Sequence, residues 1–146
     1  MENKIVLEDL EYIYNVLSAK EKTMLRSSVI LITGCGGFLG YYFMQFFAHF
    51  RERLKIKSII GLDNFLIGKP FWLKQLSKSQ KRYMKIYDFN IAKNELKCIR
   101  GVNEVNFVVH MASIASPAFY RKFPLETVDA NVWEYVSFLI STEIGN

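Results

Sequence analysis

The sequence predicts an α/β fold in which helices pack on both faces of a parallel sheet. Short apolar runs of strand length alternate with segments of helical periodicity along the chain. The stretch VILITGCGGFLGYY, residues 29–42, joins such a run to a helix-length segment through spaced glycines. A carboxylate, Asp63, follows the next apolar run. This alternation favours a doubly wound sheet with right-handed crossovers, for which we predict the strand order 3-2-1-4.

An additional helix is predicted before the sheet begins. Residues 5–19 have apolar side chains at helical spacing, namely Val6, Leu10, Ile13 and Leu17. Ser27 and Ser28 interrupt the pattern just before the first strand, residues 29–33. We therefore divide the chain into a helical extension, residues 1–27, and an α/β domain, residues 28–146. We assign no chemistry to the extension.

Three glycines at three-residue spacing, Gly34, Gly37 and Gly40, predict a cradle for phosphate. Glycine at a tight turn permits positive φ and lets a pyrophosphate approach the backbone. The anion would lie at a helix N-terminus, where unpaired N–H groups and the helix dipole favour negative charge. Gly40 would allow close packing of helix and strand. The alternative is an ordinary glycine-rich turn, but the strand before it and the helix after it favour dinucleotide binding.

The helix that follows the glycine turn is predicted to bury one side. That side carries Leu39, Phe43, Phe46, Phe47 and Phe50, whereas His49 lies on the opposite, polar side. We therefore interpret His49 as a surface residue. Cys35, inside the turn, is interpreted as a small packing residue.

The second strand, residues 58–62, ends at Asp63. Ligands of such sheets bind at the carboxyl ends of the strands, where a carboxylate can accept both hydroxyls of an adenosine ribose. The same charge would repel a 2′-phosphate, so we predict NAD as cofactor rather than NADP. The alternative is an aspartate that only turns the chain.

The remaining elements complete a four-stranded pattern. We expect helices over residues 71–75, 91–99 and from after Pro124 to about residue 140, and strands over residues 83–87 and 105–110. Asp88 follows the third strand. The fourth strand is apolar with little alternation, which is typical of a centrally buried parallel strand.

Composition limits the classes of function. The 146 residues, 51% hydrophobic and 23% charged, fit one globular domain. The net charge of +5 comes from basic residues that are spread along the chain, so we expect solvated faces and no nucleic-acid partner. Two cysteines, no signal peptide and no membrane-spanning run favour a soluble cytoplasmic protein without a membrane partner. We identify no metal-ligand set.

The motifs resemble those of the extended short-chain dehydrogenase/reductase family, over about residues 28–132. TGCGGFLG, residues 33–40, matches the TGxxGFxG cofactor turn of its nucleotide-sugar epimerase, dehydratase and decarboxylase branch. DNFLIG, residues 63–68, is similar to the DNFxxG of UDP-glucuronate decarboxylases and many 4-epimerases. HMASIASPAFYRKFP, residues 110–124, closely resembles the decarboxylase segment HLASPASPPxYxxxP, with Ile114 in place of a proline. In YDFN, residues 87–90, Asp88 occupies the position of the family's adenine-contacting aspartate.

This resemblance implies a Rossmann fold, bound NAD and a nucleotide-sugar substrate, UDP- or dTDP-linked. The cofactor-binding residues it implies are Gly34, Gly37, Phe38, Leu39, Gly40, Asp63, Asn64, Phe65, Gly68, Asp88, Phe89, Ala112 and Ser113. Phe89 would contribute its backbone, whereas Ala112 and Ser113 would follow the phosphates and the nicotinamide ribose. Ser116 and Tyr120 would face the sugar nucleotide, and Asn131 matches an asparagine of the next helix.

The chemistry that the resemblance implies is oxidation of the sugar at C4 by NAD. Decarboxylation, dehydration or epimerisation follows, and the hydride then returns. The family's base is a tyrosine whose pKa is lowered by a lysine four residues later. No tyrosine in this sequence has a lysine at that position, so we assign no catalytic residue.

Two interpretations follow from this missing pair. The chain is the N-terminal NAD-binding portion of such an enzyme, ending before the Tyr-x-x-x-Lys helix and the substrate region. Alternatively, it is a short Rossmann module that binds a dinucleotide or a partner chain without turnover. In either case the fourth strand would have an unpaired outer edge, from which we expect self-association or marginal stability.

Overall fold

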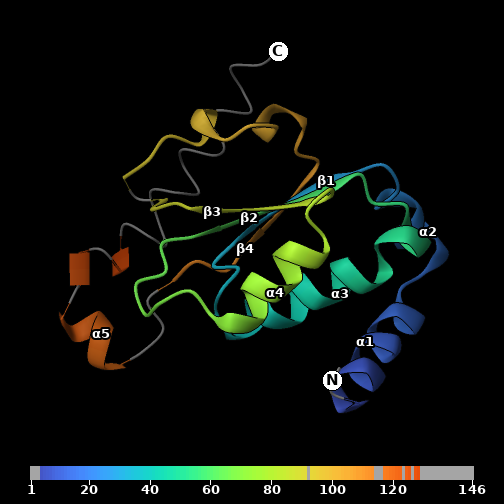
Figure 1. The fold of residues 1–146 in the computed structure, drawn as a ribbon, viewed down its shortest axis with the longest axis horizontal. Helices are drawn as coiled ribbons and strands as arrows, with labels where there is room; N and C mark the ends of the chain where they lie inside the picture. Colours follow the sequence, from blue (N-terminus) through green and yellow to red (C-terminus); the bar gives the residue numbers. More distant parts are fainter. Residues whose placement is uncertain (1–3, 92, 114–116, 123, 126, 129–146) are drawn as a thin grey trace.

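The computed structural model describes residues 4–91, 93–113, 117–122, 124–125 and 127–128. A four-stranded parallel sheet with the order β3-β2-β1-β4 forms its centre (Figure 1). The strands are β1 (Val29–Thr33), β2 (Ser58–Asp63), β3 (Met84–Asp88) and β4 (Phe107–His110). The predicted fold class and strand order are confirmed.

Helices cover one face of this sheet (Figure 1). On the other face, where helices were also predicted, the described residues form the shorter 3₁₀ turns. The helices are α1 (Lys4–Val16), α2 (Ala19–Met24), α3 (Phe38–Leu54), α4 (Phe71–Ser79) and α5 (Pro117–Lys122), and the 3₁₀ turns are η1 (Leu96–Cys98) and η2 (Val102–Glu104). α3 lies between α1 and α4 and contacts both. No helix in the described part of the chain is long and apolar enough to cross a membrane.

The central strand β1 is buried along its whole length because both of its faces are covered. Ile30 and Ile32 pack into the core beneath α3, together with Met44 and Phe50. Leu31 belongs to the core on the opposite face, which the segment containing η1 and η2 covers. A continuous apolar strand is what two covered faces require.

The N-terminal segment forms two helices rather than the predicted single one over residues 5–19. α1 ends at Val16, and Ser18 begins α2. The Ser18 hydroxyl accepts from the Glu21 N–H at 3.2 Å, while the Glu21 carboxylate accepts from the Ser18 N–H at 2.7 Å. This reciprocal capping box starts a new helix and therefore breaks the longer one.

The helix predicted over residues 91–99 is also wrong. Its described residues form turns and the short η1. Asn90 and Asn94 close a local turn, in which the Asn94 side chain accepts from the Asn90 N–H at 3.0 Å. Asparagine competes with helix formation in this way because its amide bonds the nearby backbone.

Smaller corrections concern α3, α4 and the edge strands. Leu39 and Phe43 are exposed rather than buried, because only the later turns of α3 lie over the sheet core; His49 is exposed as predicted. α4 continues to Ser79, β3 is Met84–Asp88, and β4 starts only at Phe107. β4 is half exposed rather than centrally buried, because it lies at the edge of the sheet. The helix predicted after Pro124 lies mostly outside the described residues.

The docking of α1 on α3 gives a first test. Leu10 is 2% exposed in the core that includes Phe50, whereas Tyr12 on the same helix is 70% exposed. We expect Leu10→Ala to lower the free energy of unfolding by about 3 kcal/mol, through lost burial and a residual cavity. Urea unfolding followed by circular dichroism would measure it.

Tyr12→Ala is the matched control, and we expect it to change stability by less than about 0.5 kcal/mol. Equal effects of the two substitutions would contradict the docking of α1 described above.

Candidate functional site

The glycine turn connects the end of β1 to the start of α3 at the carboxyl edge of the sheet. Gly34 has φ +67°, and a Cβ there would lie 2.6 Å from the Met111 carbonyl oxygen. Both the backbone angle and the close neighbour therefore require glycine. Gly37 is the N-cap residue of α3 and provides no side-chain cap. The N-terminus of α3 thus lacks a side-chain acceptor of its own, as an anion cradle requires.

Gly40 permits the close approach of α3 to this turn. A Cβ at Gly40 would lie 2.4 Å from the Gly34 carbonyl oxygen and 2.6 Å from that of Cys35. Such distances leave no room for a side chain. The predicted role of Gly40 in close packing therefore agrees with its geometry.

Asp63 lies at the end of β2 and faces the glycine turn. Its Oδ2 atom accepts a hydrogen bond of 2.8 Å from the Gly36 N–H, and Oδ1 accepts one of 2.8 Å from the Phe65 N–H. The carboxylate is therefore held between the turn and its own loop. Each oxygen retains a further lone pair for a ligand hydroxyl.

Gly36 was not among the residues that the sequence analysis selected. A Cβ at this position would lie 3.1 Å from Asp63 Oδ2, so a side chain would crowd the carboxylate. The adjacent pair Gly36–Gly37 was the available signal. The three-residue spacing selects Gly34, Gly37 and Gly40 and leaves Gly36 out.

Cys35 fills the space beneath this site. It is fully buried, and a Cβ on Gly61 of β2 would lie 2.9 Å from its Sγ atom. Burial, with a smaller contribution from the negative charge of Asp63, raises the pKa of the Cys35 thiol to about 12. The thiol therefore stays protonated and unreactive near neutral pH, in agreement with a packing role.

Thr33 ties the glycine turn to the segment after β4. The buried Thr33 Oγ1 lies 3.1 Å from the Met111 nitrogen and 3.2 Å from the Ala112 nitrogen, and it accepts from both. It also lies 2.8 Å from His110 Nδ1. The tautomer of the His110 ring decides which of these two atoms donates. A hydroxyl at the end of the buried run VILIT was the signal for this contact.

The loop after Asp63 folds into a tight turn. Asn64 Oδ1 accepts from the Leu66 N–H at 3.1 Å, and the Phe65 carbonyl accepts from the Gly68 N–H at 2.7 Å. Phe65 and Gly68 both have positive φ. A Cβ on Gly68 would meet no heavy atom within 4 Å, so Gly68 serves the turn and not close packing.

Asp88 lies beside Asp63 in the sheet register and is exposed. The Phe89 side chain is buried, and its N–H donates to the Asp63 carbonyl oxygen at 2.9 Å. The Phe89 side chain is therefore not available at this edge, and its N–H is engaged within the sheet.

The other predicted site residues surround the same edge or lie outside the described part. Phe38 and Leu39 are exposed at the start of α3, and Ala112 and Ser113 follow β4. Tyr120 is exposed on α5. Ser116, Ile114 and Asn131 lie outside the described residues. Within the described residues no His, Cys, Asp and Glu side chains group as a metal site.

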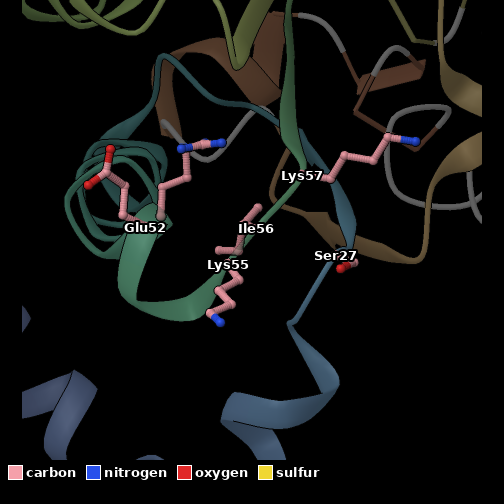
Figure 2. A pocket seen from close by; sticks show the side chains of 6 residues that line it. Ser27, Glu52, Lys55, Ile56 and Lys57 are labelled. Atoms are coloured by element: carbon pink, nitrogen blue, oxygen red, sulfur yellow. The ribbon is translucent and has the colours of Figure 1, made fainter.

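A separate hollow of about 530 Å³ lies at the opposite edge of the sheet. Figure 2 shows its lining, Ser27, Arg51, Glu52, Lys55, Ile56 and Lys57, from the end of α3 and the starts of β1 and β2. Arg51 stacks on the Tyr83 ring, and Lys57 pairs with Glu104. Because its lining residues lie at the amino ends of β1 and β2, this hollow is separate from the glycine turn at the carboxyl ends of the strands.

Solved structures share this fold. The chain aligns with a UDP-glucose 4-epimerase from Stenotrophomonas maltophila, crystallised with NAD and formylated UDP-arabinopyranose, at TM-score 0.60 and 14% identity over 80% of its own length. It aligns with Pen from Bacillus thuringiensis at TM-score 0.57 and 16% identity over 77%. It spans 33% and 32% of those two chains. No protein-family model matches the sequence.

The glycine turn provides a second test, in which two glycines of similar φ are compared. Gly34→Ala and Gly68→Ala both impose a side chain on positive φ, which costs about 1 kcal/mol. Only at Gly34 would the added Cβ atom also clash with backbone atoms of Met111 and Ala112. We therefore expect Gly34→Ala to destabilise the fold by roughly 2 kcal/mol more than Gly68→Ala.

Chemical unfolding of both variants would measure this difference. Equal losses of stability would show that the close contact between residues 34 and 111 is absent in solution.

Proposed function

We propose that this chain is the NAD-binding part of an enzyme that oxidises and modifies nucleotide-sugars. The observation that supports it best is the Asp63 carboxylate, held at 2.8 Å by the Gly36 N–H at the carboxyl edge of the sheet. A carboxylate beside a glycine turn is the arrangement that recognises adenosine ribose in dinucleotide-binding folds.

The same edge provides for the other parts of the cofactor. The amides at the start of α3 would receive the pyrophosphate, because the glycines leave the backbone accessible. Asp63 would accept the ribose hydroxyls, and Asp88 and the Phe89 backbone would lie near the adenine. A negative charge at Asp63 disfavours a 2′-phosphate, so we propose NAD rather than NADP. When bound, NAD would supply reversible hydride transfer at the sugar.

The substrate class rests on the motifs and on the likeness to an epimerase crystallised with a UDP-sugar. The segment 110–124 most resembles that of UDP-glucuronate decarboxylases, so we propose a UDP-linked uronic acid as substrate and decarboxylation as outcome. Ser113 and Tyr120, both exposed after β4, would then face the nicotinamide ribose and the sugar nucleotide. This reaction would take place in the cytoplasm, as part of polysaccharide synthesis.

A second candidate function is binding without turnover. It is favoured by one observation, the lack of a tyrosine followed four residues later by a lysine. These residues would then retain the dinucleotide while lacking the group that removes the hydroxyl proton. Cofactor binding is common to both candidates and is therefore the property to measure.

We expect this chain to bind NAD more tightly than NADP, and Asp63→Ala to weaken NAD binding roughly 10- to 100-fold. That range corresponds to a lost hydrogen bond to a charged acceptor. Isothermal calorimetry with NAD and NADP would measure both effects. Asp9→Ala, which removes an exposed carboxylate from α1, is the control and should leave the affinity unchanged.

Unchanged NAD affinity in Asp63→Ala would remove Asp63 from the site. An absence of heat with NAD, when a longer form of the protein does bind it, would show that further residues complete the site.

We also propose that copies of the chain associate along the outer edge of β4. No described strand pairs with that side of β4, and its sequence FVVH is mostly apolar. Such edges add strands from other chains unless a charge protects them. We expect dimers or larger species in sedimentation velocity, and mostly monomers for Val108→Lys. A monodisperse, cooperatively folded monomer of the unmodified chain would contradict this proposal.

A further inference from the structure

The net positive charge of the protein comes from one segment. Residues 64–82 contain five basic side chains and no acidic one, namely Lys69, Lys74, Lys78, Lys81 and Arg82. Because the chain has 19 basic and 14 acidic residues, the remainder holds 14 of each. Along the sequence the basic residues are spread over several segments. The fold gives these five a common location, on and around α4.

The exposed side of α4 gathers part of this charge on one surface. Lys69, Phe71, Lys74 and Lys78 line one open hollow of about 800 Å³, together with Gln75, Ser77 and Ser79. Phe71 is 73% exposed, whereas Leu73 on the other side of the helix is fully buried. Among the described residues, no ion pair engages the three lysines. Lys69 Nζ lies 4.8 Å from the centre of the Phe65 ring, so the charges of Lys74 and Lys78 are the ones most available to a partner.

An apolar turn lies next to this surface. The hydrogen bond from the Gly68 N–H to the Phe65 carbonyl closes the turn and leaves Leu66 and Ile67 at its two corners. These side chains are 56% and 80% exposed. Turn corners ordinarily carry glycine, proline or short polar residues. Two aliphatic side chains held in water by a closed turn are therefore an unusual feature of this loop.

We infer that this surface docks on an anionic lipid bilayer. We call it the α4 surface and define it as Leu66, Ile67, Lys69, Phe71, Lys74 and Lys78. The lysines would contact acidic headgroups, and the apolar side chains would enter the boundary between headgroups and acyl chains. This mode needs no helix that crosses the membrane.

The composition of the α4 surface favours lipid over nucleic acid. Single-stranded nucleic acid is bound through backbone charge and the stacking of successive bases on aromatic rings. The α4 surface offers only one exposed ring, Phe71, and its other apolar side chains, Leu66 and Ile67, are aliphatic. The Ser77 and Ser79 hydroxyls donate to carbonyls of their own helix, at 3.1 and 2.9 Å, and so are engaged locally. Apolar side chains beside lysines match an interface with both a charged and an apolar layer.

This inference departs from our expectation of no membrane partner. Leu66 and Ile67 share a loop with cofactor-binding residues that the resemblance implies, but the inference does not rest on cofactor binding, since no residue of the α4 surface is one of those residues. The two proposals can therefore fail separately.

Co-sedimentation with lipid vesicles tests whether the α4 surface docks on an anionic bilayer. We expect the protein to bind vesicles of phosphatidylcholine mixed with phosphatidylserine, and not vesicles of phosphatidylcholine alone, with binding that falls as salt rises. Lys74→Gln/Lys78→Gln should weaken binding roughly tenfold or more, since each lysine near an anionic membrane contributes several-fold. Leu66→Ser/Ile67→Ser should weaken it by a similar factor.

Each double variant has a matched control. Lys20→Gln/Arg26→Gln removes two exposed charges near α2, and Tyr12→Ser/Val16→Ser removes two exposed apolar side chains from α1. Both should bind within about twofold of the unmodified chain, because they leave the α4 surface intact. Thermal unfolding would confirm that every variant is folded.

Four results would overturn the inference. Equal binding to the two kinds of vesicle would exclude charge recognition, and equal losses in the matched controls would exclude this surface. Binding to single-stranded DNA or polyglutamate that depends on Lys74 and Lys78, without any binding to vesicles, would assign the surface to another polyanion or to a protein. Displacement of the protein from vesicles by inorganic pyrophosphate, at a phosphate concentration equal to that of the lipid, would show that the α4 surface binds free phosphate instead.

Discussion

The close backbone contacts of the glycine turn are the constraint on which the rest of the structure depends. Gly34 allows the end of β1 to approach the Met111 carbonyl, and Gly40 allows α3 to approach the Gly34 carbonyl. These contacts set where α3 begins and how it crosses the sheet. They also bring three separate segments to one edge, namely the turn, the end of β2 and the residues after β4.

Around this contact the chain places polar groups so that each has a defined partner. The Asp63 carboxylate accepts from Gly36 and Phe65, and the Thr33 hydroxyl accepts from the amides of Met111 and Ala112. Beneath them Cys35 is buried and remains a neutral thiol. These hydrogen bonds therefore hold the carboxyl edge of the sheet in one arrangement within the protein itself.

Side chains that bond nearby backbone amides, in competition with a continuous helix, explain where two sequence-based predictions of helices were wrong. The 5–19 helix was divided by a capping box at Ser18, and the 91–99 helix was replaced by turns that Asn90 and Asn94 close. Periodicity detects neither effect, because each depends on one side chain bonding a nearby amide. The exposure of Leu39 and Phe43 depends instead on how far α3 extends beyond the sheet core, which only the packed structure specifies.

By itself, the sequence determined the fold class, the strand order and the candidate residues at one edge, because alternating strands and helices permit few topologies. Only the tertiary structure decided that Asp63 bonds Gly36, that Thr33 holds Met111 and Ala112, and which side of α4 stays exposed. Those contacts join residues far apart in the chain or on neighbouring turns. Their geometry depends on how the elements pack, and spacing along the chain does not contain it.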